Sequence, residues 1–167
     1  CLPVLFSAGR GRPVAVAAAH AGWRGLAAGV LDHTIASLCR SAECDPSDVR
    51  AWLGACIGPE AFEVGADVLQ AFGVDPLAAQ GDRDPPPPAA ACFRYAPRTD
   101  GSPRWRADLA GLARLRLKTL GLSVDRIGGV EACTVNEPSR FFSYRRDGLT
   151  GRMAACVRLM DGDGSRG

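Results

Sequence analysis

Two side chains near the start of the sequence are the first candidates for chemistry. His20 lies in a segment of small residues and is one of two histidines in the chain. Cys1 opens an apolar run, and a hairpin that pairs this run with the one ending at His20 places thiol and imidazole on neighbouring strands. A thiolate and an imidazole suit Zn²⁺ or a similar ion. We therefore predict that Cys1 and His20 are metal ligands and catalytic residues; the alternatives are a buried core thiol and a histidine that packs the turn.

The residues that follow this turn suit a planar, anionic ligand. Trp23 carries a ring whose face can stack on a planar group. Arg24 stands near the start of a predicted helix, where backbone N–H groups and a guanidinium can hold an anion together. We predict that Trp23 binds substrate and that Arg24 acts in catalysis.

A second group of candidates lies near the end of the chain. Cys133 follows a predicted strand and is either a pocket thiol or part of the core. Phe142 and Arg145 belong to segment 141–148, where aromatic rings and guanidinium groups alternate as in a pocket for a planar anion. The alternative for this segment is a hairpin with a charged Asp-Gly turn. His33 lies inside a helical pattern, and we expect a structural role for it.

The elements that must position these residues follow from the apolar periodicity. Residues 2–6 and 14–19 are predicted to be strands joined by a turn at 8–13, and residues 24–39 a helix. His20 then stands at the carboxyl end of a strand, a location that ligand sites in α/β sheets favour. We also predict strands at 50–57, 125–131 and 151–160, helices at 63–72 and 107–120, a loop at 73–101 with four consecutive prolines at 85–88, and a disordered tail at 161–167.

Composition bounds the class of protein. A chain of 167 residues with 47% hydrophobic and 23% charged residues is long enough for one domain with its own core, which we place at residues 1–160. The net charge of +2 does not favour nucleic-acid binding, and no apolar run is long enough to cross a membrane. Seven cysteines without a C-x-x-C spacing favour reduced thiols and a cytoplasmic location. Because the chain opens in mid-strand without a methionine, we expect further sequence upstream.

Several segments together resemble one known family, the YfiH family, also called the laccase-domain or multicopper polyphenol oxidase-like family. The resemblance extends over nearly the whole chain, through residues 1–6, 20–25, 53–54, 57–59, 62–65, 108–109, 133–134 and 141–152. It implies an α+β fold with mixed sheets layered with helices, similar to the cytotoxic necrotizing factor toxins and their cysteine hydrolase-type Cys/His pair. It also implies a metal, usually zinc, held by two histidines and one cysteine. Cys1 and His20 match two of these ligands, and the third is expected upstream of Cys1, in an N-terminal part that is missing here.

The resemblance implies a metal-dependent purine nucleoside enzyme as the leading function. Such an enzyme would act as a phosphorylase on adenosine, inosine or methylthioadenosine and as an adenosine deaminase. Trp23 or Phe142 would stack on the base, and Arg24 or Arg145 would hold phosphate. The expected partners are therefore a nucleoside and phosphate, with no nucleic acid or membrane, and the oligomeric state is left open.

Three alternatives stay open at this point. The first is a laccase-like polyphenol oxidase using copper, against which the small number of histidines argues. The second is a cysteine-type amidohydrolase acting on peptidoglycan precursors, with Cys1 as nucleophile and His20 as base. The third is a binding module whose site is inactive.

Overall fold

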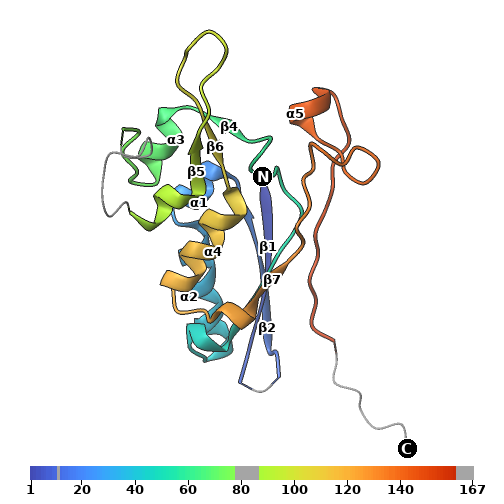
Figure 1. Ribbon diagram of the computed structural model, residues 1–167. Helices are drawn as coiled ribbons and strands as arrows, with labels where there is room; N and C mark the ends of the chain where they lie inside the picture. Colours follow the sequence, from blue (N-terminus) through green and yellow to red (C-terminus); the bar gives the residue numbers. More distant parts are fainter. Residues whose placement is uncertain (11, 78–86, 161–167) are drawn as a thin grey trace, which may run out of the picture.

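A four-stranded mixed sheet forms the centre of the computed structural model, which describes residues 1–10, 12–77 and 87–160 (Figure 1). The central strand β1 (Leu2–Ala8) pairs antiparallel with β2 (Ala15–Ala21) on one side and with β3 (Val49–Leu53) on the other. Strand β7 (Ile127–Gly129) adds to β3 in parallel, giving the order β2-β1-β3-β7. The predicted hairpin is therefore confirmed, and its register sets Pro3 opposite His20.

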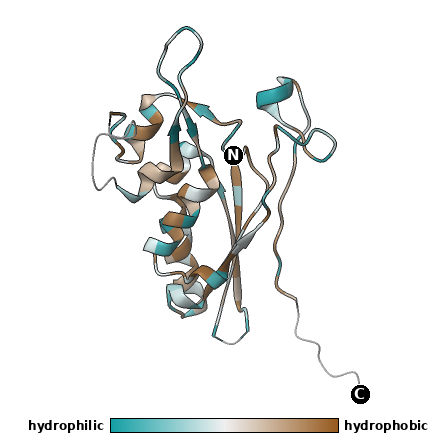
Figure 2. Ribbon diagram, in the orientation of Figure 1, coloured by the Kyte–Doolittle hydropathy of each residue, from teal (hydrophilic) through white to brown (hydrophobic). Residues whose placement is uncertain are grey.

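Helices cover one face of this sheet, and the alternation of side chains along β1 explains why. Its residues at every second position are buried, namely Leu2, Val4, Phe6 and Ala8. They pack toward α1 (Trp23–Ala27), α2 (Val30–Ala42) and α4 (Leu109–Thr119), whose apolar residues belong to the same core (Figures 1 and 2). The opposite face of the sheet stays partly exposed, and Trp52 on β3 is 42% exposed there.

A second, three-stranded sheet was not predicted from the sequence. It has the order β4 (Glu63–Val64), β6 (Trp105–Ala107), β5 (Phe93–Tyr95), with α3 (Ala66–Ala71) after its first strand. The predicted helix at 63–72 is thus wrong over its first residues, because Glu63 and Val64 pair with β6. The predicted loop at 73–101 likewise contains the 3₁₀-helix η3 (Pro88–Cys92) and β5. Strands of two or three residues are too short to show an alternation in the sequence.

Two helix predictions had different outcomes. The single helix predicted at 24–39 is wrong: Gly29, with φ +82°, separates α1 from α2. A left-handed residue ends a helix, and glycine adopts that conformation without a Cβ clash. The helix predicted at 107–120 is confirmed as α4, and Asp108 caps it by accepting a hydrogen bond from the Gly111 N–H at 2.8 Å.

The later part of the chain departs most from the predictions. The strand predicted at 151–160 is wrong, since these residues form no ladder with any strand in the described ranges. The alternative of a hairpin with an Asp-Gly turn in segment 141–148 is also wrong: the short helix α5 (Tyr144–Asp147) takes its place, with Gly148 as its C-cap. The strands predicted at 50–57 and 125–131 shorten to β3 and β7, each preceded by a 3₁₀ turn, η1 (Pro46–Asp48) or η4 (Val124–Arg126). Residues 85–86 of the proline run and the tail at 161–167 lie outside the described residues.

The architecture is therefore a mixed α+β fold with helices layered on mixed sheets, as the sequence predicts in outline. Among the described residues, no helix has both the length and the apolar character needed to cross a bilayer.

Candidate functional site

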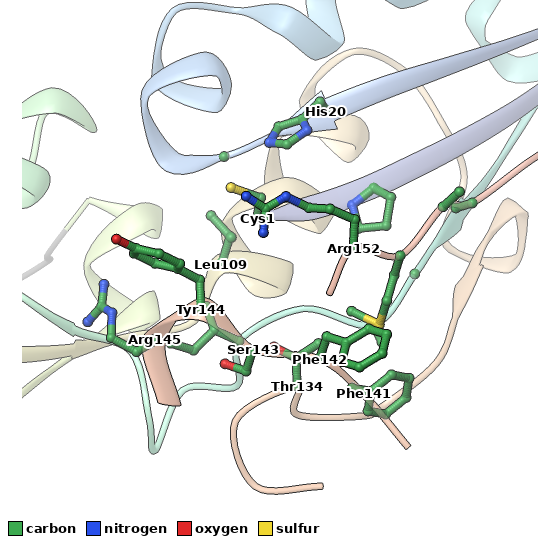
Figure 3. A pocket seen from close by; sticks show the side chains of 18 of the residues that line it. Cys1, His20, Leu109, Thr134, Phe141, Phe142, Ser143, Tyr144, Arg145 and Arg152 are labelled. Atoms are coloured by element: carbon green, nitrogen blue, oxygen red, sulfur yellow. The ribbon is translucent and has the colours of Figure 1, made fainter. Parts of the chain in front are cut away.

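A cavity of about 640 Å³ opens beside the amino end of β1 (Figure 3). Cys1, Pro3 and His20 line it from the hairpin, while residues 140–145 and 150–155 line it from the later part of the chain. Small-molecule sites generally have volumes of about 300–1,000 Å³. The cavity therefore has the size of a ligand site and is built from segments far apart in the sequence.

Cys1 and His20 face one common space at this end of the cavity. The hairpin places Cys1 just before β1 and His20 near the end of β2, next to Gly22. A methyl group built on Gly22 would lie 3.3 Å from the Cys1 Sγ and 3.8 Å from the His20 Nε2. Gly22 therefore leaves room for the thiol and the imidazole to approach a shared ligand. Both side chains are exposed to that space, which is a requirement for chemistry.

Arg146 holds the opposite wall together. Its guanidinium donates to the carbonyl oxygens of Thr134 at 2.9 Å, Val135 at 3.1 Å and Phe141 at 3.0 Å. It also donates two hydrogen bonds to the Asp147 carboxylate, each at 2.7 Å. The hydrogen bonds from Arg146 are the main reason that the pKa of Asp147 lies below its usual value. These bonds fix the loop at 134–147, which presents the aromatic and cationic side chains of the cavity.

The predicted substrate-binding residues of this loop do line the cavity. Phe142 is 53% exposed, and its ring lies against Gly151, where a methyl group would come within 2.7 Å of the Phe142 Cε2. Arg145 extends from α5, with its guanidinium 5.8 Å from the centre of the Phe62 ring. Trp23 also lines the cavity, at the start of α1. The structure thus brings Trp23, Phe142 and Arg145 together with Cys1 and His20.

Two other predicted residues are not part of the lining. The guanidinium of Arg24 is exposed and lies over the Trp23 ring, 4.4 Å from its centre. The Cys133 Sγ accepts a hydrogen bond from the Gly58 N–H at 3.2 Å, and Cys133 forms a parallel bridge with Cys56. His33 stands on α2, where its Nδ1 lies 2.8 Å from the Gly29 carbonyl oxygen.

Several lining residues are not among those that the sequence singles out. Ser143 and Tyr144 lie in the segment of alternating aromatic and guanidinium groups, and Arg152 falls in the predicted strand at 151–160, yet all three line the cavity. The signal available for them was the resemblance over 141–152, which does not say where a side chain points. The cavity lining includes Arg140, Arg145 and Arg152 but no aspartate or glutamate among the described residues.

Comparison with known proteins settles the family. Residues 1–160 match the family described as multi-copper polyphenol oxidoreductase laccase. The chain belongs to this family. It is 44% identical, over 161 residues, to the Escherichia coli (strain K12) protein named purine nucleoside phosphorylase YfiH, covering 96% of this chain and 56% of that protein. It is 45% identical, over 154 residues, to a Xylella fastidiosa (strain Temecula1) purine nucleoside phosphorylase, covering 92% of this chain and 52% of that protein.

Solved structures agree with this assignment. A crystal structure of a Neisseria meningitidis protein of the DUF152 family matches with a TM-score of 0.69 and 47% identity, covering 89% of this chain and 52% of that one. The Bacillus licheniformis protein YfiH matches with a TM-score of 0.69 and 30% identity, covering 88% and 49%. The chain spans about half the length of the curated relatives it matches. The resemblance to the YfiH family is therefore confirmed.

The laccase-family name implies a metal, and the cavity offers two donors that suit one. A thiolate and an imidazole are ligands that zinc and copper accept, and the Cys1 Sγ and His20 Nε2 flank the same space beside Gly22. A catalytic zinc site needs about three protein ligands. Within the described ranges, no group of three or more His, Cys, Asp or Glu side chains is placed to hold an ion. The described residues thus fit two positions of a metal site and do not complete it.

Proposed function

We propose that this chain contributes the substrate cavity of a purine nucleoside phosphorylase. The observation that carries the proposal is the cavity itself, in which Cys1 and His20 share one space and face aromatic rings and guanidinium groups. The names of the relatives from Escherichia coli and Xylella fastidiosa support the choice of substrate. We place the activity in a single domain of residues 1–160. We also place it in the cytoplasm, because all seven cysteines are free thiols.

The proposed reaction assigns a task to each wall of the cavity. In phosphorolysis, a phosphate oxygen bonds to C1′ of the ribose while the bond from C1′ to the base nitrogen breaks, giving a free purine and ribose 1-phosphate. Trp23 and Phe142 present ring faces on which a purine can stack. Arg145 and Arg152 line the cavity, and a guanidinium offers two parallel N–H donors to phosphate. Holding both substrates in one cavity supplies the proximity that a two-substrate reaction requires.

Zinc is the metal we propose for this site, with copper as the alternative. Cys1 and His20 would hold it, together with ligands from outside the described residues. When bound, the ion supplies a Lewis acid. We extend the proposal to adenosine, inosine and methylthioadenosine as substrates and to adenosine deamination, the activities that the family resemblance implies.

Two other activities are alternatives for the same cavity. The closeness of Cys1 to His20 also suits a cysteine-type amidohydrolase acting on peptidoglycan precursors, with thiol as nucleophile and imidazole as base. Copper-dependent phenol oxidation is the activity in the family name. A multicopper centre is bound by many imidazoles. His20 lines the cavity, but His33 lies on α2 with its Nδ1 next to the Gly29 carbonyl oxygen. A single imidazole in the lining argues against a multicopper centre there.

The test is an assay of the protein in its natural full-length form with inosine and phosphate, with and without added zinc. We expect hypoxanthine and ribose 1-phosphate in equal amounts, with both products lost in Cys1→Ser and His20→Ala. Cys44→Ser is the matched control, since Cys44 does not line the cavity. Absence of free base and ribose 1-phosphate at every zinc or copper loading would overturn the proposal.

A further inference from the structure

We propose that Arg152 forms the phosphate subsite of this cavity, beside Cys1 and His20, and that Arg24 does not. The inference rests on the proposed function and makes it specific, because it names the residue that holds the second substrate. The ligand is a phosphate group, either inorganic phosphate or the phosphate of a nucleotide.

The charge of the cavity is the first argument. Three guanidinium groups line it, and no carboxylate does so among the described residues. Arg140 is already compensated, since it donates to the Glu137 carboxylate and its guanidinium lies 4.9 Å from the centre of the Phe141 ring. Arg145 and Arg152 form no ion pair with any residue in the described ranges. Uncompensated cations facing one cavity attract an anionic ligand.

The direction of Arg152 is the second argument. In Figure 3 its side chain points toward the end of the cavity that holds Cys1 and His20, whereas Arg145 lies further along the opposite wall. The one hydrogen bond that Arg152 forms within the described structure is a long contact of 3.4 Å from Nη1 to the Gly151 carbonyl oxygen. Its guanidinium therefore keeps its donors available for a bidentate contact with phosphate oxygens.

The position of Gly151, directly before Arg152, is the third argument. Gly151 lies directly against the Phe142 ring, with its built methyl position 2.7 Å from the Phe142 Cε2. Phe142 and Arg152 thus line the same cavity, and the residue before Arg152 lies against the Phe142 ring. Arg24 has no such place, because its guanidinium is stacked on Trp23 outside the lining.

The experiment measures phosphate binding without turnover, by calorimetric titration of the full-length protein with inorganic phosphate and, separately, with adenosine monophosphate. We expect Arg152→Gln to weaken binding by about 10- to 100-fold, the range for losing a charged hydrogen-bonding partner. Arg152→Lys should recover only part of the affinity, because lysine keeps the positive charge but lacks the two parallel N–H donors of the guanidinium. Arg40→Gln, on the exposed end of α2, removes the same charge away from the cavity and should leave the affinity unchanged.

The KM values for the two substrates distinguish the loss of a phosphate contact from a general structural defect. In Arg152→Gln the KM for phosphate should rise by the same factor while the KM for inosine stays unchanged. Tight binding of the nucleotide alone would assign the subsite to a nucleotide phosphate. Loss of phosphate affinity in Arg24→Gln but not in Arg152→Gln would overturn the assignment, as would wild-type protein that binds neither probe. Phosphate binding that depends on Arg152 without any release of base would leave the subsite standing and contradict the proposed function.

Discussion

At the scale of single residues, Gly22 leaves open the space that the Cys1 thiol and the His20 imidazole both face. Its backbone, with φ −65° and ψ 159°, is an extended conformation open to any residue, so glycine is needed here for space. We predict that Gly22→Val places methyl groups between the thiol and the imidazole and lowers kcat/KM for phosphorolysis by about 100-fold, as small displacements of reacting groups do. The fold should stay intact, as judged by an unchanged circular dichroism spectrum.

The matched control is Gly128→Val in β7, because a Cβ built on Gly128 meets no atom within 4 Å. Cys1 provides a second readout that does not depend on the substrate. Its alkylation rate, followed peptide by peptide with mass spectrometry, should fall in Gly22→Val and stay unchanged in Gly128→Val. Equal activity and equal Cys1 alkylation in both variants would contradict the role given to Gly22.

The residues of the site differ in how far the sequence could predict them. Cys1 and His20 could be paired because a hairpin register follows from two apolar runs and one turn. Arg24 could not be placed, since nothing in the sequence says that its guanidinium turns onto the Trp23 ring. Arg152 could not be placed either, because its position depends on a backbone path that no periodic pattern specifies.

At the scale of elements, the loop at 134–147 depends on one guanidinium. Arg146 spans from the start of this loop to α5 through three carbonyl oxygens and the Asp147 carboxylate. We predict that Arg146→Ala lowers the free energy of local opening of this loop by about 2 kcal/mol, since removing a charged hydrogen-bond partner costs about that much. Hydrogen exchange of the amides at 141–148 should accelerate accordingly, and kcat/KM for inosine should fall with it.

Arg146→Lys distinguishes charge from geometry, because an ammonium group cannot reach all of these acceptors at once. It should therefore resemble Arg146→Ala more than wild type. Arg126→Ala in η4 is the control, since the Arg126 side chain donates no hydrogen bond within the part of the chain that the structure describes. Wild-type exchange rates at 141–148 in Arg146→Ala would refute this account of the loop.

Elements were predictable where their pattern was long. In the β1–β2 hairpin and in α4, the apolar residues recur over enough positions to predict the element, and Asp108 marks the start of α4. The strands β4, β5 and β6 have two or three residues each and leave no period. The segment 151–160 has the composition of a strand, but a strand also requires a partner, and partners are set by the whole fold.

At the scale of the whole molecule, an ion pair joins helices α2 and α4, which pack in the same core. Helix α2 packs on the four-stranded sheet, and α4 follows directly from β6 of the three-stranded sheet. Asp32 of α2 accepts two hydrogen bonds from Arg116 of α4, one of them from Nε at 3.0 Å. The hydrogen bonds from Arg116 are the main reason that the pKa of Asp32 lies below its usual value.

The lowered pKa gives this link a definite dependence on pH. A carboxyl group whose pKa is depressed by folding stabilises the folded state above its ordinary pKa, and this contribution is lost as the pH falls through the lowered value. Arg116 is 47% exposed, so solvent screens the pair. We predict that Asp32→Asn lowers the free energy of unfolding by about 0.5 kcal/mol at neutral pH, in the range of surface ion pairs.

In acid the difference between the two proteins should shrink, because below the ordinary pKa the carboxyl group of the unfolded wild-type chain takes up a proton while the folded chain resists it. Urea unfolding at about pH 7 and about pH 3 measures both differences, with Asp having an ordinary pKa of about 3.9. Glu131→Gln is the matched control, since Glu131 is exposed and forms no ion pair with the described residues. A deficit in Asp32→Asn that is equally large at both pH values would mean that the asparagine disturbs helix packing, and that the charge of Asp32 does not stabilise the contact between α2 and α4.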